Sequence, residues 1–477
     1  MRTQLFIDGE WREATSARQL EVVNPATEEH VAAVEFAGPS EVDAAAQAAR
    51  RCFESDAWRG MSGRKRGALL HRAGELLRER RAEFAELETR QNGKPLFESK
   101  IDVASTVETL QYFAGWSDKV GGEVLPVARQ DFVYTEREPI GVVGAIVPWN
   151  FPLNLASWKV APALAAGCTV VLKPAPETPL TALAFAELLH DAGFPPGAVN
   201  VVPGDGPTTG AALVRHPGVD KIAFTGSTAT GRMIMREAAD GPKRVSLELG
   251  GKSPNIVFED ADLKAAVRGA QTGIFYGKGE VCAAGSRLLV QRSVHDQVVE
   301  QLVERAGRLT VGDPFDQHTR IGAIVSRRQH EKVLSYVEAG KRDATLVTGG
   351  NALTVGGKGY FIEPTIFDGA EPGMSIVDEE IFGPVLSVLT FEDVEEALAL
   401  ANRTVYGLAA GIWTRDIGKA IRTARAVRAG TVWINTYNQY DSAAPFGGVK
   451  ASGFGRDLGR EALDGYTDVK TVWVGLT

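Results

Sequence analysis

The stretch GVVGAIVPWN, residues 141–150, begins a segment in which apolar strands alternate with amphipathic helices as far as Gly251. A helix-like run, SWKVAPALAAG (157–167), closes at Gly167 and leads into the strand-like CTVVLKP (168–174). Strands that helices cover on both faces read in sequence as continuous apolar runs. The segment therefore predicts an α/β fold with a Rossmann-like, doubly wound parallel sheet. Ligands of such sheets bind beyond the carboxyl ends of the strands.

The flanking regions show three other patterns. FIDGEW (6–11) predicts a tight hairpin whose turn is Asp8–Gly9. Residues 40–111 read as helical, with Ser40 as the expected N-cap before a run of strong helix formers. Residues 252–448 repeat the βα alternation less regularly, which predicts a second α/β domain.

Two segments alternate apolar and polar residues and have no core of their own. They are QDFVYTEREP (130–139) and DGYTDVKTVWVGLT (464–477). Strict alternation is typical of strands with one exposed face. We expect these segments to pair with each other and, because an exposed strand can pair with another chain, to take part in an oligomer.

Length and composition exclude several classes of protein. A chain of 477 residues is too long for one core, and its 44% hydrophobic and 23% charged residues are typical of a globular protein. The net charge of -8 argues against a nucleic-acid partner, which would need a basic patch. No apolar run is long enough to span a membrane, and the N-terminus has no secretory pattern. Three cysteines form no disulfide framework, so a reduced, cytoplasmic location is expected.

Three polar residues are candidates for catalysis. Cys282 lies among glycines and small residues in YGKGEVCAAGSR (276–287), Glu248 ends an apolar run in VSLELGGKSPN (245–255), and Asn150 follows the first strand in PWNFP (148–152). A thiol with open approach can act as a nucleophile, a desolvated carboxylate as a base and a strand-end amide as an oxyanion donor.

Each candidate also has an ordinary structural interpretation. A single cysteine is most often a small buried apolar residue, and this is our interpretation of Cys52 and Cys168. A strand glutamate is often an ion-pair partner, and an asparagine beside prolines is typical of turns. The acidic cluster around Glu380 could suggest a metal, but the seven histidines show no ligand spacing and we expect no metal.

A glycine-containing strand–helix junction, FTGSTATG (224–231), could place backbone amides against a pyrophosphate. Alone it is weak support for a dinucleotide site. The run LGGKS (249–253) does not complete a phosphate-binding loop, because Ser246 stands where the first glycine is required.

Seven motifs, taken in order, carry a stronger signal. This sequence resembles the aldehyde dehydrogenase superfamily of the NAD(P)-dependent, hydrolytic type, and the resemblance runs nearly from end to end. The motifs are PWNFPL, WKVAPALAAGCTVVLKPA, FTGSTATG, LELGGKSPNIVF, GEVCAAGSR, EEIFGPV and PFGGVKASGFGR. The separation of 34 residues between Glu248 and Cys282 also matches the family.

The resemblance implies a role for each matching residue. Cys282 would be the nucleophile, Glu248 the general base and Asn150 the oxyanion donor, with Lys159 nearby. Lys173 would hold the adenosine ribose, and Glu380 and Phe382 would position the nicotinamide ribose and ring. The other implied cofactor-binding residues are Ile146, Trp149, Gly226, Ser227, Gly231 and Leu249.

The resemblance also implies a chain in three parts. We expect an NAD(P)-binding domain at 1–120 and 140–251, a catalytic domain at 252–448, and a small β arm for oligomerisation at 121–139 and 458–477. The arm implies a homo-oligomer, a dimer or a tetramer.

Two positions depart from the common pattern of the family. Pro176 stands where many NAD-preferring members have a glutamate that binds the ribose hydroxyls, and the sequence leaves open whether Glu177 replaces it. We expect NAD as the cofactor, with NADP possible.

Glu280 replaces a glutamine two residues before the nucleophile. An ionised carboxylate facing the sulfur would raise the pKa of the thiol, so we expect Glu280 to point away.

The expected reaction is oxidation of an aldehyde to a carboxylic acid through a cysteine thiohemiacetal and thioester. Glu248 favours hydrolysis over transfer to a thiol cofactor. A cysteine hydrolase or esterase without redox chemistry is the alternative enzyme, and a non-catalytic chain that has kept the fold is a third interpretation.

The substrate pocket should draw on Phe151, Asn154, Trp158 and the loop 434–446, with Tyr437 and Tyr440. We expect an uncharged aliphatic or aromatic aldehyde, whose identity the sequence does not fix.

Overall fold

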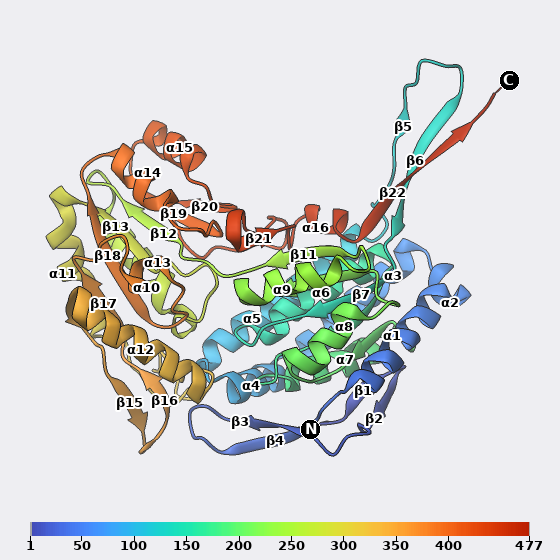
Figure 1. The fold of residues 1–477 in the computed structure, drawn as a ribbon, viewed down its shortest axis with the longest axis horizontal. Helices are drawn as coiled ribbons and strands as arrows, with labels where there is room; N and C mark the ends of the chain where they lie inside the picture. The colour runs from blue at the N-terminus through green and yellow to red at the C-terminus, as the bar shows by residue number, and fades with distance from the viewer. Residues whose placement is uncertain (1, 477) are drawn as a thin grey trace.

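A computed structural model describes residues 2–476, and Figure 1 shows two α/β lobes with a long arm. The first lobe contains an eight-stranded sheet in the order β2-β1-β9-β8-β7-β10-β11-β21. Its strands are β1 (Leu5–Ile7), β2 (Glu10–Arg12), β7 (Val142–Ile146), β8 (Thr169–Lys173), β9 (Val199–Val201), β10 (Lys221–Thr225), β11 (Arg244–Glu248) and β21 (Gly453–Phe454).

The five central strands of this sheet, β9-β8-β7-β10-β11, are parallel. The chain leaves β7 toward β8 and β9 on one side, then returns to place β10 and β11 on the other. This reversal of strand order makes the crevice between β7 and β10 the topological switch point, where doubly wound sheets bind ligands. The predicted parallel sheet is confirmed.

Helices flank this sheet and fill the first lobe. Those before the sheet are α1 (Pro39–Glu54), α2 (Asp56–Arg59), α3 (Gly63–Glu79), α4 (Arg81–Asn92) and α5 (Leu96–Trp116). Those between its strands are α6 (Pro152–Ala166), α7 (Leu180–Asp191), α8 (Ala211–Arg215) and α9 (Thr228–Ala238). As predicted, α6 ends at Gly167, which takes the left-handed conformation with φ of 99°.

Local signals at the N-terminus were correct for the hairpin and wrong for the first helix cap. Asp8 and Gly9 both have positive φ in the turn between β1 and β2, as the hairpin prediction requires. The N-cap of α1 is Gly38, not Ser40. Pro39 fixes the first helical φ, and the Glu41 carboxylate accepts a hydrogen bond from the Gly38 amide at 2.8 Å, so the helix begins earlier than predicted.

The second lobe contains a seven-stranded sheet in the order β14-β17-β18-β13-β12-β19-β20, parallel except at β14. Its strands are β12 (Pro254–Val257), β13 (Arg287–Gln291), β14 (Thr345–Thr348), β17 (Thr365–Asp368), β18 (Val385–Phe391), β19 (Ala409–Trp413) and β20 (Thr431–Ile434). Its helices are α10 (Leu263–Phe275), α11 (His295–Ala306), α12 (Arg327–Asp343), α13 (Ser375–Asp378), α14 (Val394–Asn402) and α15 (Ile417–Ala426). Two hairpins, β3 (Gln19–Val23) with β4 (His30–Glu35) and β15 (Ala352–Val355) with β16 (Lys358–Ile362), lie outside both large sheets.

The arm is a three-stranded antiparallel sheet that projects away from both lobes (Figure 1). It consists of β5 (Val124–Leu125), β6 (Phe132–Pro139) and β22 (Thr467–Val474). Residues of β6 and β22 pair along their whole length, from Phe132 with Val474 to Pro139 with Thr467, which confirms the predicted pairing. The short helix α16 (Glu461–Asp464) precedes β22 and packs on the first lobe through buried Ala462 and Leu463.

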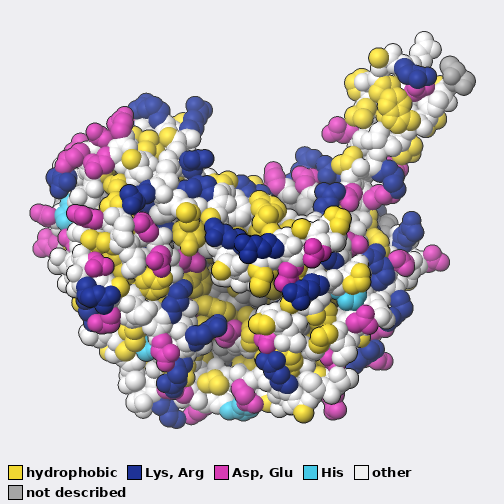
Figure 2. All heavy atoms as spheres, viewed as in Figure 1, with side chains coloured by type: hydrophobic (Ala, Val, Ile, Leu, Met, Phe, Trp, Pro, Cys, Tyr) yellow, Lys and Arg dark blue, Asp and Glu magenta, His cyan; other side chains and the backbone are white. Residues whose placement is uncertain are grey.

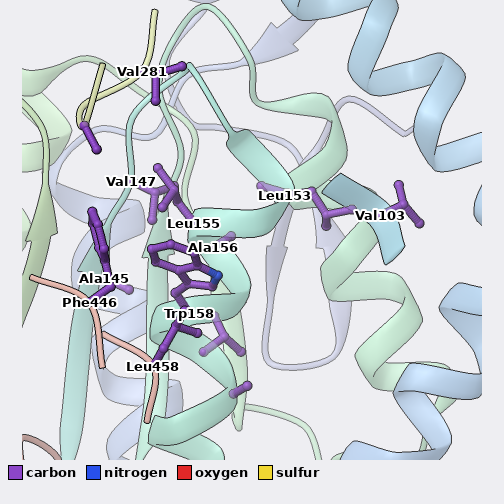
Figure 3. Packing of buried hydrophobic residues seen from close by; sticks show 14 of the residues in the cluster. Val103, Ala145, Val147, Leu153, Leu155, Ala156, Trp158, Val281, Phe446 and Leu458 are labelled. Carbon is purple, nitrogen blue, oxygen red and sulfur yellow. The ribbon is translucent and has the colours of Figure 1, made fainter. Parts of the chain in front are cut away.

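The predicted division into three domains stays a prediction, because sheets and cores do not show which parts fold independently. Figure 3 shows the main core around Trp158, with side chains from β7, α6 and the segment after β20. Among residues 2–476, no helix is both long and apolar enough to cross a membrane.

Candidate active site

Three loops of the first lobe meet two loops and the helix α12 of the second lobe around one cavity of about 220 Å³. The first lobe contributes the segments that follow the carboxyl ends of β7, β10 and β11. The second lobe contributes Cys282, which precedes β13, and Glu380 with Phe382, which precede β18. The cavity therefore lies between carboxyl ends of one parallel sheet and amino ends of the other.

Cys282 reaches the cavity from a tightly turned loop. The short helix η2 (Tyr276–Gly279) contains three consecutive residues with positive φ, Gly277, Lys278 and Gly279. A side chain on Gly279 would meet the Gly383 carbonyl at 2.1 Å, so only glycine lets these two segments pass. Burial, with smaller effects of Glu248 and Glu380, raises the pKa of the Cys282 thiol to about 12. At neutral pH the thiol is protonated in this state, and its attack requires a base.

Glu248 is the carboxylate that faces the same cavity. It ends β11, is 5% exposed, and has no hydrogen-bond partner for either carboxylate oxygen among the described residues. Burial raises its pKa well above the ordinary value, and the negative charge of Asp457 raises it further. Lys159 opposes this effect and forms a buried ion pair with Asp457. A desolvated carboxylate with free lone pairs is a good proton acceptor.

Asn150 lines the cavity from the loop after β7. Its Nδ2 donates a hydrogen bond to the Glu280 carbonyl at 3.0 Å, and its Oδ1 has no partner among the described residues. A primary amide has two N–H donors, so one remains for a ligand. The hydrogen bond joins the Asn150 loop to the Cys282 loop.

Most residues predicted to bind a cofactor line this cavity. They are Trp149, Gly226, Ser227, Leu249, Glu380 and Phe382. Ser227 caps α9, so the first amides of that helix open toward the cavity, where an anion is favourable. Phe382 has φ of 62° and packs edge-to-face on Trp149, with ring centroids 5.2 Å apart.

Glu380 is held in place by a glycine. Its Oε1 accepts a hydrogen bond from the Gly251 amide at 2.9 Å. A side chain on Gly250 would meet the Glu380 carboxylate at 2.3 Å, so the first glycine of the Gly250–Gly251 pair makes room for that carboxylate.

Three predicted cofactor residues lie next to the cavity rather than on its lining. Ile146 and Lys173 pair with each other at the carboxyl ends of β7 and β8. Burial lowers the pKa of Lys173 to about 8, although Glu177 and Asp205 oppose this effect. Gly231 is in α9, and a side chain there would meet Leu249 at 2.6 Å, so its absence lets the helix pack on the segment after β11.

Three polar residues of α12 that line the cavity were not predicted from the sequence. Arg328, Gln329 and Lys332 extend from the first turns of this helix, which in sequence has only an ordinary charged face. Gln329 Nε2 donates to the Phe382 carbonyl at 2.7 Å, and Lys332 Nζ donates to the Glu380 carbonyl at 3.1 Å. These bonds hold the strained backbone at Phe382.

The two departures from the family pattern have clear surroundings. The Glu280 carboxylate is engaged by Lys278 at 2.8 Å and by the Val325 amide at 3.1 Å, as expected for a side chain turned away from the sulfur. Glu177 forms an ion pair of 3.5 Å with Arg328, one of the cavity residues, and its charge acts on Lys173. A carboxylate is therefore present beside Lys173 although Pro176 is not acidic.

The predicted substrate side is aromatic. Trp158 packs edge-to-face on Phe446, with ring centroids 5.7 Å apart, and also approaches Tyr440 at 6.3 Å. Figure 3 shows Trp158 and Phe446 close together in the core. Tyr437 is buried, and its hydroxyl donates to the Ala283 carbonyl at 2.9 Å, so this ring supports the cysteine loop from the core. That Tyr437 also lines the substrate pocket stays a prediction.

Comparisons with known proteins agree with this geometry. The model of the aldehyde dehydrogenase family matches residues 11–472. Retinal dehydrogenase 2 of Mus musculus is 48% identical over 476 residues, which cover 99% of this chain and 92% of that protein. Mitochondrial aldehyde dehydrogenase of Homo sapiens is 47% identical over 475 residues, covering 99% and 92%. The structure of an NAD+ complex of aldehyde dehydrogenase from Bacillus cereus has a TM-score of 0.98 at 49% identity, covering 100% of this chain and 97% of that one.

Proposed function

The chain belongs to the aldehyde dehydrogenase family and is an NAD-dependent aldehyde-oxidising enzyme, and we propose that it works through a Cys282 thioester that water hydrolyses. The observation that carries this proposal is the single cavity lined by Cys282, Glu248 and Asn150. The family match favours this reaction over a cysteine hydrolase without redox chemistry.

The residues around the cavity fit a dinucleotide. The amino end of α9 suits a pyrophosphate, and the unpartnered, buried Thr225 hydroxyl lies on the same lining. Lys173, Glu380 and Phe382 would hold the two riboses and the nicotinamide ring. When bound, NAD supplies a hydride acceptor for the aldehyde carbon. The chain itself supplies the nucleophile, the oxyanion donor and the base.

The acylation step uses Cys282 and Asn150. The Cys282 sulfur bonds to the aldehyde carbon, and the thiol proton passes to solvent water. The oxygen of the substrate becomes an oxyanion that the free N–H of Asn150 binds. Such a donor contributes about 3 kcal/mol to a transition state. Loss of a hydride from the same carbon then leaves a thioester on Cys282.

The hydrolysis step uses Glu248. Its unpartnered oxygens can accept a proton from water, whose oxygen then bonds to the thioester carbon. The C–S bond breaks, the carboxylic acid leaves, and Cys282 regains its proton. No part of this step needs a second thiol.

The substrate proposed is an uncharged aldehyde with an aliphatic or aromatic body. Trp158, Tyr440 and Phe446 provide an aromatic wall. The loop 434–446 contains no lysine or arginine that could bind a second carboxylate. Buried aromatic surface favours an apolar body, and a carboxylate without a partner would be desolvated there.

We also propose that the arm joins copies of this chain in a homo-oligomer, a dimer or a tetramer. Trp473 and Val469 on β22 are 57% and 56% exposed. Figure 2 shows hydrophobic side chains gathered toward the tip of the arm. Apolar strand faces of this kind usually become buried in an interface.

A reducing, cytoplasmic location is proposed as well, because all three cysteines are free and the reaction needs a thiol.

One assay tests the reaction as a whole. Purified enzyme, NAD and an aliphatic or aromatic aldehyde should form NADH and carboxylate in equal amounts, without coenzyme A. A stoichiometric requirement for a thiol cosubstrate would contradict hydrolysis. A strong preference for succinate semialdehyde over uncharged aldehydes would contradict the proposed substrate class.

A further inference from the structure

A cluster of buried charged side chains lies behind the two loops that carry Cys282 and Asn150. We call Glu88, Lys94, Glu98, Asp102, Lys278 and Glu280 the buried charge cluster, and none of them is more than 3% exposed. The proposed chemistry assigns no role to any of them. Charged groups are almost never buried without a partner, so their arrangement needs a reason.

Lys278 and Glu280 make contacts to both catalytic loops. The Lys278 Nζ lies 2.8 Å from the Glu280 carboxylate, and it donates to the backbone carbonyl and the Oδ1 of Asn92 at 2.9 Å each. Asn92 Nδ2 in turn donates to the Trp149 carbonyl at 2.8 Å. The Glu280 carbonyl accepts the hydrogen bond from Asn150. Two parallel connections therefore join the segments around residues 149–150 and 278–280.

The backbone of this loop needs such support. Lys278 has φ of 61°, a left-handed conformation that costs free energy for a residue with a side chain. Residues in such conformations persist where the surrounding structure holds them. Its ion pair and its bonds to Asn92 are the contacts that hold it.

Two glutamates of the cluster accept hydrogen bonds from backbone amides at or next to the same two loops. Glu98 Oε1 accepts a hydrogen bond from the Gly277 amide at 3.1 Å, and Glu88 Oε1 accepts one from the Leu153 amide at 3.4 Å. Lys94 pairs with Asp102 at 2.6 Å. The two lysines are thus each matched by one carboxylate, and burial raises the pKa of both Glu88 and Glu98 to about 7.

We propose that Lys278, Glu280 and Asn92 are positioning residues that hold the Asn150 amide opposite the Cys282 sulfur. This inference rests on the proposed oxyanion role of Asn150. The ion pair fixes the Glu280 carbonyl, which orients the Asn150 amide, and Asn92 fixes the preceding carbonyl of Trp149. None of the three needs to contact the substrate.

A double-mutant cycle tests the pair. Lys278→Gln or Glu280→Gln alone leaves one buried charge without its partner, whereas Lys278→Gln with Glu280→Gln leaves a neutral pair of similar size. We expect each single variant to slow the pre-steady-state burst of NADH at least about tenfold, and the double variant to recover most of that loss. The dissociation constant of NAD should stay within about twofold of the wild-type value, because these residues do not line the cavity.

Reference and control variants separate the possible failures. Asn150→Ala measures the oxyanion donor itself: a normal burst there contradicts the proposed function, not the positioning. The positioning role is overturned if the burst is slow in Asn150→Ala but normal in both single variants at 278 and 280. It is also overturned if the loss of burst rate in the double variant equals the sum of the two single losses in free energy. The matched control is the half-buried pair Lys419 with Asp260, 3.1 Å apart, where Lys419→Gln should lower thermal stability without slowing the burst.

A second variant keeps the test decisive if a single charge change prevents folding. Asn92→Ala removes the hydrogen bond to the Trp149 carbonyl and leaves the ion pair intact. Because the substitution also removes the acceptor of hydrogen bonds from Lys278 Nζ and the Lys94 amide, we expect lower thermal stability and, in the folded enzyme, a burst that is about three- to tenfold slower. A wild-type burst in a folded Asn92→Ala enzyme overturns the proposal.

Discussion

The two large sheets each contain a reversal of strand order, and they differ in the polar groups that lie at the carboxyl ends of their strands. In the eight-stranded sheet the order reverses between β7 and β10, and in the seven-stranded sheet it reverses between β12 and β19. At the second reversal, Asp260 accepts hydrogen bonds from the Thr414 hydroxyl, the Asp416 amide and Lys419 Nζ. At the first, Glu248, the Oδ1 of Asn150 and the Thr225 hydroxyl are buried without partners among residues 2–476.

The difference shows that the carboxyl ends of a parallel sheet can either pair their polar groups with each other or leave them free to bind a ligand. Buried polar groups are normally hydrogen-bonded, and leaving one unpaired costs about 1–3 kcal/mol. In the second crevice, donors of the protein itself occupy the Asp260 carboxylate, which then has less capacity to bind a ligand. The first retains that capacity, and the fold itself does not decide which crevice is used.

The largest expected effect in the first crevice is that of Cys282→Ala. Removing the sulfur prevents formation of the covalent intermediate, so turnover should fall by roughly a thousandfold or more. Steady-state NADH formation measures this loss, and NAD binding by calorimetry should be unchanged as a control. Substantial aldehyde oxidation by a folded Cys282→Ala enzyme would remove the basis for the covalent route.

Glu248→Gln should separate acylation from hydrolysis. The amide is close in size but accepts protons poorly, so the steady-state rate should fall by about a hundredfold or more while a burst of NADH remains. Burial raises the pKa of the Cys282 thiol, and the charge of Glu248 raises it further. Without that charge, iodoacetamide should alkylate the thiol of the variant at lower pH than the wild-type thiol. A full steady-state rate in this variant is incompatible with the assigned base.

Asn150→Ala should remove one oxyanion donor and leave both the thiol and the base. The expected fall in kcat is about 10²–10³, with little change in the KM for NAD. Rapid-mixing kinetics should place the loss in the burst phase. A defect confined to hydrolysis would instead assign Asn150 to a different step.

Glu177→Gln should change cofactor preference with a smaller effect. Its carboxylate lies beside Lys173 and pairs with Arg328, so removing its charge should favour the extra phosphate of NADP. We expect the ratio of kcat/KM for NADP to that for NAD to rise by about five- to tenfold, corresponding to roughly 1 kcal/mol. Arg215→Gln, which breaks a distant surface pair with Glu237, is the control and should leave this ratio unchanged.

Asp260→Asn in the second crevice should have the smallest effect on activity. Burial opposes ionisation of this carboxyl, but the Thr414 hydroxyl and Lys419 outweigh burial and keep its pKa below the ordinary value. A lowered folded pKa contributes stability above the unfolded pKa, and that contribution is lost as the pH falls through the folded value. The variant should unfold at lower temperature at pH 7, with kcat unchanged. A large loss of kcat would mean that the two crevices are not functionally separate.

The sequence predicted much of the site because its chemistry is carried by local motifs. Asn150 follows a strand that apolar periodicity had located, Glu248 ends another, and Cys282 lies in a motif of glycines and small residues. Six of the expected cofactor residues line the same cavity. Sequence patterns gave no indication of Arg328, Gln329 and Lys332. A helix that turns a polar face to a cavity has the same periodicity as one that turns it to solvent.

The sequence by itself determined the parallel sheet, the family and the pairing of 130–139 with 464–477, because alternation and motif spacing are local properties of the chain. Only the tertiary structure decided that Tyr437 supports the cysteine loop and that Asn92 joins Lys278 to the Trp149 carbonyl. Such contacts join residues far apart in the chain, and they depend on how the lobes pack. Packing selects one partner among many that have the same local pattern.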